Sequence, residues 1–185
     1  MIPSPVDCTL ADLEAALDAA SPAERLAWMR TLKKATMTRL YELAEGRDVT
    51  PEFFLTPQGG ECTWAGRNSL PAFNDFAKAF ANHEGRIQGY NVNSGIAAWF
   101  GGPGHYLTRI CGDEHGEQLI FDYLWQADSA PESFPQLASN DSGTNKLVYG
   151  GMKDVVRRLS NDLIISKAYR NGKVEGAFFS LCRPG

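Results

Sequence analysis

The sequence is poor in cysteine and histidine, the residues that build disulfide scaffolds and zinc sites. It contains four cysteines and three histidines in 185 residues. Cys8, Cys62, Cys111 and Cys182 are far apart, and no two of them form a C-x-x-C pair. We therefore expect free thiols, with Cys111 and Cys182 buried beside apolar strand residues. Neither a metal site nor a dense disulfide framework is expected.

Long apolar runs and an excess of positive charge are also missing. No apolar stretch approaches the roughly 18 residues that a membrane-spanning helix requires. The first residues show neither the basic nor the apolar segment of a secretory signal. The net charge of −4 provides no electrostatic footprint for nucleic acid or an anionic membrane. We expect a soluble, cytoplasmic protein that binds neither nucleic acid nor a membrane.

Helix signals are concentrated in the first fifty residues. Ser21-Pro22-Ala23-Glu24 combines an N-cap serine, a proline at the first helical position and a glutamate three residues after the cap. Apolar residues then recur at spacings of three and four as far as Gly46, which predicts a helix over 22–44. A shorter helix is expected over 10–19, with Thr9 as its cap.

From about residue 60 the pattern becomes strand-like, with one interruption. Leu70, Phe73, Phe76, Ala77 and Phe80 have helical spacing and predict a helix over 71–82. After it, short apolar runs alternate with turn residues such as Asn171-Gly172, which favours a type I′ hairpin, while 127–145 is an irregular stretch. The expected strands are 61–66, 86–93, 95–100, 105–111, 118–125, 147–159, 163–169 and 174–182.

Seven or eight short strands without interleaved helices argue against a parallel sheet and for a closed or strongly curved antiparallel one. We expect a mainly β, α+β fold in one domain over 1–185, because no linker composition divides the chain. In this fold 60–183 form a small barrel and 1–48 form a helical extension packed on it. About eight strands enclose enough interior for side chains or for one small ligand.

Two segments resemble a known family. Cys62-Thr63-Trp64-Ala65-Gly66 resembles the opening motif of small bacterial proteins named for Gly-x-Trp-x-Gly, with Cys62 in place of the first glycine. The segment 148–158, with its Tyr, Asp and Arg-Arg, and the final aromatic strand ending in Arg183 are similar to that family's closing pattern. The resemblance implies a lipocalin-like, calycin-type barrel in which Trp64 is a structural plug near the closed end. It implies no particular activity.

Side-chain alternation along the predicted strands selects polar candidates for the barrel interior. Lys167 and Tyr169 share one face of their strand, where a desolvated lysine could act as a base or Schiff-base nucleophile and a tyrosine as a proton donor. His105 follows a glycine-rich turn and could act as acid or base. Asp122, if inward, is a candidate general base. Each candidate has a structural alternative. Lys167 could be a surface lysine, the glycine-rich segment before His105 could be only a hairpin turn, and Asp122 could pair with an arginine across the sheet.

Arginines and aromatic residues complete the candidate set. Arg157 and Arg158 cannot both face inward, because neighbours on a strand point to opposite faces. Arg157 is expected either to anchor a ligand or to form an ion pair at the barrel rim, because an unpaired buried charge is costly. The residues expected to contact an apolar ligand, besides Arg157, are Tyr90, Trp99, Tyr106, Tyr123 and Phe179.

Two functions of different classes follow. The first, toward which we lean because ionisable residues are numerous on the strands, is a cofactor-independent isomerase, cyclase or lyase acting on a small hydrophobic metabolite. Its catalytic residues would be His105, Asp122, Lys167 and Tyr169, acting by acid/base chemistry. The second is a non-catalytic carrier of the calycin type, in which the same residues orient the ligand. The two differ in whether polar groups converge on one reacting position. A homodimer formed through the N-terminal helices is a third hypothesis, resting on their length.

Overall fold

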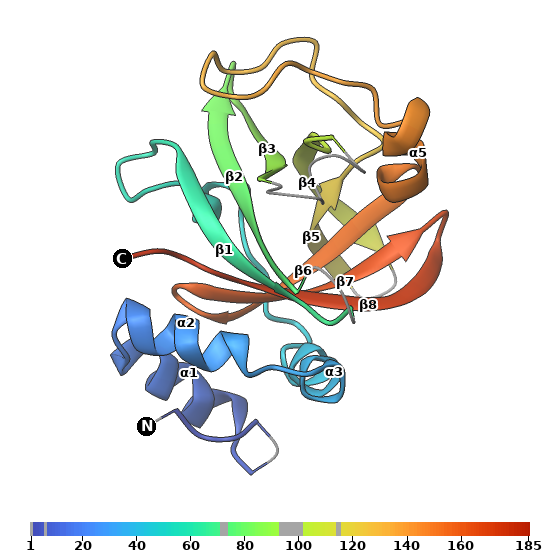
Figure 1. The fold of residues 1–185 in the computed structure, drawn as a ribbon. Helices are drawn as coiled ribbons and strands as arrows, with labels where there is room; N and C mark the ends of the chain where they lie inside the picture. The colour runs from blue at the N-terminus through green and yellow to red at the C-terminus, as the bar shows by residue number, and fades with distance from the viewer. Residues whose placement is uncertain (1, 6, 71–73, 93–101, 114–115) are drawn as a thin grey trace.

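Eight antiparallel strands form a closed barrel in the computed structural model (Figure 1), which describes residues 2–5, 7–70, 74–92, 102–113 and 116–185. Each strand pairs with the next along the chain, and the last pairs with the first, so the expected antiparallel barrel is confirmed. The strands are β1 (Cys62–Asn68), β2 (Asp75–His83), β3 (Arg86–Val92), β4 (Tyr106–Asp113), β5 (Gly116–Asp122), β6 (Met152–Ser160), β7 (Leu163–Arg170) and β8 (Lys173–Cys182).

Three helices precede the barrel: α1 (Leu10–Ala19), α2 (Pro22–Arg30) and α3 (Lys34–Leu43). Thr9 caps α1 and Ser21 caps α2, as the sequence predicts, and the structure has a capping box at both sites. The single helix expected over 22–44 is broken at 31–33, because Leu32 bonds back three residues and Lys33 then has an extended backbone. Within the described residues, no helix has the length and apolar character to cross a membrane.

The helix expected over 71–82 is wrong where the structure describes it. Residues 75–83 form β2, while 71–73 lie outside the described residues. Phe76 and Phe80 face the barrel interior with Lys78 between them, and three alanines face outward. The inward lysine interrupts the alternation of apolar and polar residues that is typical of a strand. The spacing of the phenylalanines alone therefore resembled that of a helix.

Other boundaries also differ from the prediction. The start of the strand expected over 147–159 belongs to α5 (Gly143–Tyr149), a short helix beside the barrel. The strand expected over 95–100 lies outside the described residues. The irregular stretch before α5 packs on the outer face of the barrel, where Ser129 meets His83 and Phe134 contacts Tyr90.

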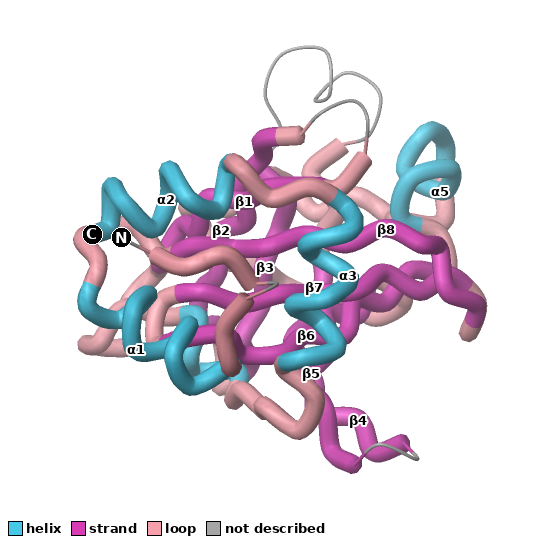
Figure 2. The backbone as a smooth tube through the Cα atoms, turned by 90° about the horizontal axis from the view of Figure 1, so that it is seen from below, coloured by secondary structure: helices cyan, strands magenta, loops and turns pink. Residues whose placement is uncertain are grey.

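Two apolar layers hold the molecule together. The inner layer fills the barrel and includes Trp64, Phe80 and Phe121. The outer layer lies between the helices and the outer face of the sheet, where α1, α2 and α3 cross the strands near β6, β7 and β8 (Figure 2). All four cysteines are free; Cys182 is buried in this outer layer as expected, whereas Cys111 is half-buried.

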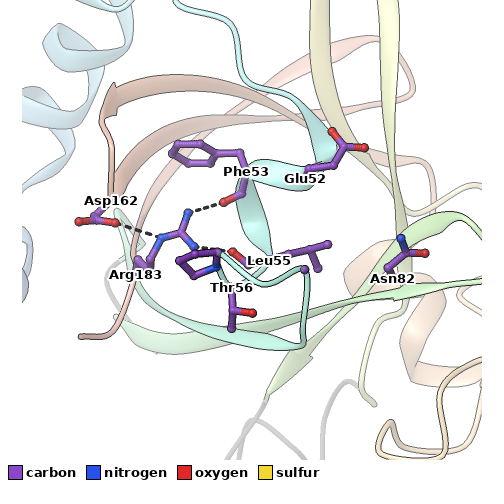
Figure 3. A pocket seen from close by; sticks show the side chains of 9 residues that line it. Glu52, Phe53, Leu55, Thr56, Asn82, Asp162 and Arg183 are labelled. Carbon is purple, nitrogen blue, oxygen red and sulfur yellow. Dashed lines mark hydrogen bonds and ion pairs between the residues drawn. The ribbon is translucent and has the colours of Figure 1, made fainter.

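The short 3-10 helix η1 (Pro51–Phe54) closes one end of the barrel. The Trp64 Nε1 group donates to the Phe54 carbonyl at 3.0 Å, and the Arg183 guanidinium lies 4.6 Å from the Trp64 ring. Arg183 also donates to the carbonyl oxygens of Phe53 and Leu55 and pairs with Asp162 at 3.0 Å (Figure 3). The fully buried Trp64 therefore lies at the closed end.

Candidate functional site

The structure distributes the expected site residues over several separate places. Tyr106, Tyr123 and Phe179 lie in the barrel interior, as expected for side chains that would contact a ligand there. Trp99 lies outside the described residues. The remaining expected residues lie on the outer side of the sheet.

The inward placement expected for Lys167 and Tyr169 is wrong. Leu163 and Ile165, on the same face of β7, belong to the outer layer beneath the helices, whereas Ile164 points into the barrel. The Lys167 ammonium lies 5.7 Å from the ring of Tyr41 in α3 and 5.3 Å from that of Tyr169. Lys167 and Tyr169 therefore flank the helical layer and do not face an interior ligand.

Asp122 is also turned away from the interior, although its side chain is fully buried. It pairs with Arg109 at 3.1 Å and with Lys153 at 3.8 Å, both from neighbouring strands, and accepts a hydrogen bond from the Leu124 amide. This is the structural alternative of an Asp–Arg pair across the sheet. Its two cationic partners hold Asp122 in an ion-pair network on the outer side of the sheet.

His105 and Tyr90 lie together beneath the irregular stretch that crosses the outer face. Their rings are 5.9 Å apart, and burial lowers the pKa of His105. The Asn140 side chain connects the irregular stretch to the barrel, because it donates hydrogen bonds to the backbone carbonyls of His105 and Tyr123 at 2.7 and 2.9 Å. His105 is therefore buried because the irregular stretch before α5 packs over it.

Arg157 is buried under α3. It donates to the Tyr41 carbonyl at 2.7 Å, and its guanidinium lies 4.1 Å from the Tyr41 ring. Its neighbour Arg158 pairs with Glu14 of α1 at 3.7 Å. Arg157 therefore anchors a helix to the sheet, a role different from both a ligand anchor and a rim ion pair.

Polar groups converge instead inside the barrel, around Lys78 of β2. Its side chain is only 2 % exposed, and its ammonium donates to Asn91 Oδ1 at 2.7 Å and to the Tyr123 hydroxyl. Asp154 of β6, equally buried, places its Oδ2 atom 3.7 Å from the ammonium. Separate parts of the barrel wall thus bring an amine, a carboxyl, a phenol and an amide to one position.

Aromatic rings form the surroundings of this polar cluster. The Lys78 ammonium lies 4.6 Å from the centroid of the Tyr106 ring and 5.1 Å from that of Phe179. Phe121 and Tyr123 contribute rings at 5.3 and 5.1 Å. Such rings attract a cation through their negative faces and exclude water, so the electrostatic interactions of Lys78 act in a low dielectric.

Burial changes the acid–base properties of the cluster. Desolvation lowers the pKa of Lys78 to about 8, although Asp154 acts in the opposite direction. Desolvation likewise raises the pKa of Asp154 to about 6, against the influence of Lys78 and Tyr123. Burial also raises the pKa of the Tyr106 and Tyr123 hydroxyls, so these phenols stay protonated near neutral pH. The amine and the carboxyl therefore both titrate close to neutrality.

Two polar atoms of the interior lack a hydrogen-bond partner among the described residues: Asp154 Oδ1 and the Tyr106 hydroxyl. Both atoms are buried, and buried polar atoms are usually paired, because leaving one unpaired costs about 1–3 kcal/mol. Together they offer an acceptor or a donor to a polar group entering the barrel.

Residues 102–104 and α5 lie next to the cluster. Asn91 Nδ2 donates to the Gly104 carbonyl at 3.1 Å, and the Tyr149 hydroxyl donates to the Gly102 carbonyl at 3.3 Å. The Tyr149 ring stacks on that of Tyr123, with centroids 5.3 Å apart and planes 8° apart. Gly104 has a positive φ of 53°, and a side chain there would collide with the Tyr149 ring. This packing covers the cluster at the end of the barrel opposite η1.

The sequence held weak signals for this cluster. Lys78 falls within the segment predicted to be a helix, and its position between Phe76 and Phe80 is the strand alternation that would have placed it inside. Asp154 lies in the segment 148–158, for which the sequence suggested a resemblance to the Gly-x-Trp-x-Gly family. Neither signal indicates that the two residues, 76 positions apart, meet across a barrel.

Other places in the molecule are less suited to chemistry. The hollow beside η1 is lined by Phe53, Leu55, Asp162 and Arg183, whose charged groups already bond to one another and to backbone carbonyls (Figure 3). Among the described residues, no group of three His, Cys, Asp or Glu side chains is arranged to hold a metal ion.

Compared with known proteins, the chain matches no family model, no curated protein and no solved structure at a significant level.

Proposed function

We propose that the protein binds a small, largely apolar molecule in the barrel interior beside Lys78 and Asp154, and that this pair transfers protons to and from it. The supporting observation is the convergence of an amine, a carboxyl and two phenols among the aromatic rings of the barrel interior. Eight-stranded barrels have an interior that holds either side chains or one small ligand. The helices cover the outer face of the sheet at β6, β7 and β8, so the interior beside Lys78 is the site that this proposal uses.

The side chains of the barrel interior indicate which kind of ligand would fit. Tyr106, Phe121 and Phe179 supply apolar ring surface, which suits an apolar or aromatic frame. Asp154 Oδ1 and the Tyr106 hydroxyl supply the polar contacts that lack a partner. The ligand that complements them is a small hydrophobic molecule with one oxygen-bearing group, such as a carbonyl or a hydroxyl.

The pKa values of the pair suit proton transfer near neutral pH. A general acid or base works best when its pKa lies near the operating pH, and those of Asp154 and Lys78 are about 6 and about 8. The protonated Tyr123 and Tyr106 hydroxyls can stabilise negative charge that develops on a substrate oxygen. Isomerisation, cyclisation or elimination without a cofactor is the reaction class that such groups support.

The test is to identify small molecules that co-purify with the protein under native conditions. Mass spectrometry of the denatured wild-type protein is expected to reveal a bound molecule. Its occupancy should fall about 10-fold or more in Lys78→Met and Asp154→Asn, since each substitution removes a polar contact worth about 1–3 kcal/mol. Asp75→Asn, at an exposed position on the same strand as Lys78, serves as the matched control.

The outcomes distinguish an enzyme from a carrier. Conversion of the recovered molecule by wild type, and its loss in Asp154→Asn, would support proton transfer. Recovery of the molecule unchanged after long incubation would instead support the second function, a non-catalytic carrier of the calycin type. Equal occupancy in wild type and Lys78→Met would place the ligand elsewhere and contradict the proposed site.

A further inference from the structure

We infer that the ligand is an aldehyde or ketone and that Lys78 attacks its carbonyl carbon to form a covalent iminium. The inference rests on the proposed function, because it names the substrate class of the same site. Within the part of the chain that the structure describes, Lys78 is the buried lysine; the other six lysines are half-buried or exposed. Its burial thus distinguishes Lys78 from the other six lysines.

Polar groups and aromatic rings both surround Lys78 Nζ. Asn91 Oδ1, the Tyr123 hydroxyl and Asp154 Oδ2 hold the nitrogen in place. The rings of Tyr106 and Phe179 lie 4.6 and 5.1 Å away. An apolar carbonyl compound lying against these rings would have its carbonyl carbon beside the nitrogen and its oxygen near the unpartnered Asp154 Oδ1 or Tyr106 hydroxyl.

The neighbouring acid makes the amine available. The pKa values of Lys78 and Asp154, about 8 and about 6, lie roughly two units apart. A proton can therefore pass from the ammonium to the carboxylate, which produces a neutral amine and a neutral carboxylic acid. Both forms of the pair have a net charge of zero, so this transfer adds no net charge to the buried site.

The reaction balances with the groups that are present. The neutral amine of Lys78 adds to the carbonyl carbon, and one amine proton moves to the carbonyl oxygen, which gives a carbinolamine. The carboxylic acid of Asp154 then donates its proton to that hydroxyl group as the C–O bond breaks. One water molecule leaves, and the iminium cation remains beside the Asp154 carboxylate, its counter-ion.

The iminium connects the covalent step with the proposed reaction class. Its positive nitrogen withdraws electrons from the adjacent carbon, so a C–H bond next to the former carbonyl becomes more acidic. The Asp154 carboxylate is the base nearest to Lys78 and can accept that proton. Reprotonation at another carbon gives isomerisation, loss of a β-substituent gives elimination, and water then hydrolyses the iminium to free Lys78.

The experiment traps the iminium by reduction. Full-length protein is incubated with benzaldehyde and sodium cyanoborohydride, and labelled lysines are located by peptide mass spectrometry. Lys78 should be labelled about 10-fold or more faster than Lys153 and Lys167, because an oriented amine beside an acid reacts faster than a solvated one. Labelling that favours the exposed lysines, with Lys78 among the slowest, would overturn the inference.

Asp154→Asn tests the proton donor. We expect about 100-fold slower labelling of Lys78 in this variant, the loss typical of a missing general acid, while labelling of Lys153 stays unchanged. The titratable groups facing Lys78 are Asp154, Tyr106 and Tyr123, with Tyr149 stacked on Tyr123. In wild type the labelling should be greatest between pH values of about 6 and 8, where the pair shares one proton. In Asp154→Asn the decline above the higher value should disappear, because this variant has no acid to lose.

A non-covalent probe separates this inference from the proposed function. Benzyl alcohol has the same ring but cannot form an iminium, and its binding is measured by titration calorimetry on wild type and on the folded control Asp75→Asn. Binding of benzyl alcohol without labelling of Lys78 would preserve the site and overturn the covalent step. Absence of both binding and labelling would contradict the covalent step and the proposed site together.

Discussion

At the scale of the residue, the buried pair of Lys78 and Asp154 is a local cost to stability. Both side chains are 2 % exposed, and removing two charges from water costs free energy that their attraction only partly offsets. The 3.7 Å separation is longer than that of a close ion pair, which weakens the attraction further. A fold that needed only packing would be better served by two apolar side chains, so stability does not explain the presence of the pair.

Substitutions at these two positions should therefore be strongly non-additive. Lys78→Met alone leaves a buried carboxyl without its partner and should lower the free energy of unfolding by about 3–5 kcal/mol at pH 7. The double variant Lys78→Met/Asp154→Leu should match or exceed the wild type by about 1–4 kcal/mol. Urea denaturation measures both.

Lys153→Met is the matched control, because Lys153 neighbours Asp154 on β6 but is 40 % exposed and makes an outer ion pair. It should change stability by less than about 1 kcal/mol, because Asp122 keeps Arg109 as a partner at 3.1 Å. A double variant as unstable as Lys78→Met would show that the pair stabilises the fold, contrary to this expectation.

The same pair determines a dependence of stability on pH. The pKa of Asp154 is higher in the folded protein than in the unfolded chain, so the folded state binds more protons and loses stability as the pH rises from about 3.8 to about 6. The pKa of Lys78 is lower in the folded protein, so stability rises again from about 8 to about 10.5. Urea titrations across pH should reveal a minimum between these ranges in wild type and its absence in the double variant.

At the scale of the element, the N-terminal helices are separate units whose starts are determined locally. Ser21 accepts a hydrogen bond from the Glu24 amide, and Glu24 bonds back to the Ser21 amide at 2.9 Å. This capping box satisfies backbone donors that a helix start leaves free. The helices gain most of their stability from packing on the sheet, where Leu17 and Leu40 are fully buried.

Ser21→Ala should therefore lower the free energy of unfolding by about 1 kcal/mol, the usual cost of losing an N-cap. Ser142→Ala is the control, because Ser142 precedes α5 but its side chain makes no capping hydrogen bond. The control should cost less than half as much in thermal or urea denaturation. Equal losses would mean that the capping box contributes nothing measurable.

At the scale of the whole molecule, Arg183 joins parts of the chain that are distant in sequence. It follows the last strand, yet it bonds to the carbonyls of Phe53 and Leu55 before the first strand and to Asp162 between β6 and β7. Asp162 in turn pairs with Arg25 of α2 at 2.9 Å. The closed end of the barrel and the helical layer are thus connected through a single guanidinium.

Arg183→Met should loosen the closed end. Two carbonyls lose a charged donor and Asp162 loses one of two arginines, so we expect a loss of about 2–4 kcal/mol in urea denaturation. Amide hydrogen exchange in η1 should accelerate. The exposed Arg39→Met, whose i,i+3 pair with Glu42 spans 3.7 Å, should leave both measurements nearly unchanged. Normal protection of η1 in Arg183→Met would contradict the proposed role.

The placement of Lys167 shows why the candidate site was harder to predict than the fold. Strand alternation separates two faces but does not say which one is inside. On β7, both faces are apolar and buried: Ile164 belongs to the inner layer, and Leu163 and Ile165 belong to the layer beneath the helices. With no solvent-exposed face as a reference, the inward side could not be chosen from this strand alone.

The sequence by itself determined the antiparallel barrel, the capped starts of α1 and α2 and the free thiols, because turns, caps and spacing depend on neighbouring residues. Only the tertiary structure decided that Lys78 meets Asp154 while Lys167, Asp122 and His105 lie outside. The partners of Lys78 come from other strands, and closure of the barrel alone brings them within reach. A contact between distant residues depends on how the whole sheet curves and on which face the helices cover, and neither is encoded in a local pattern.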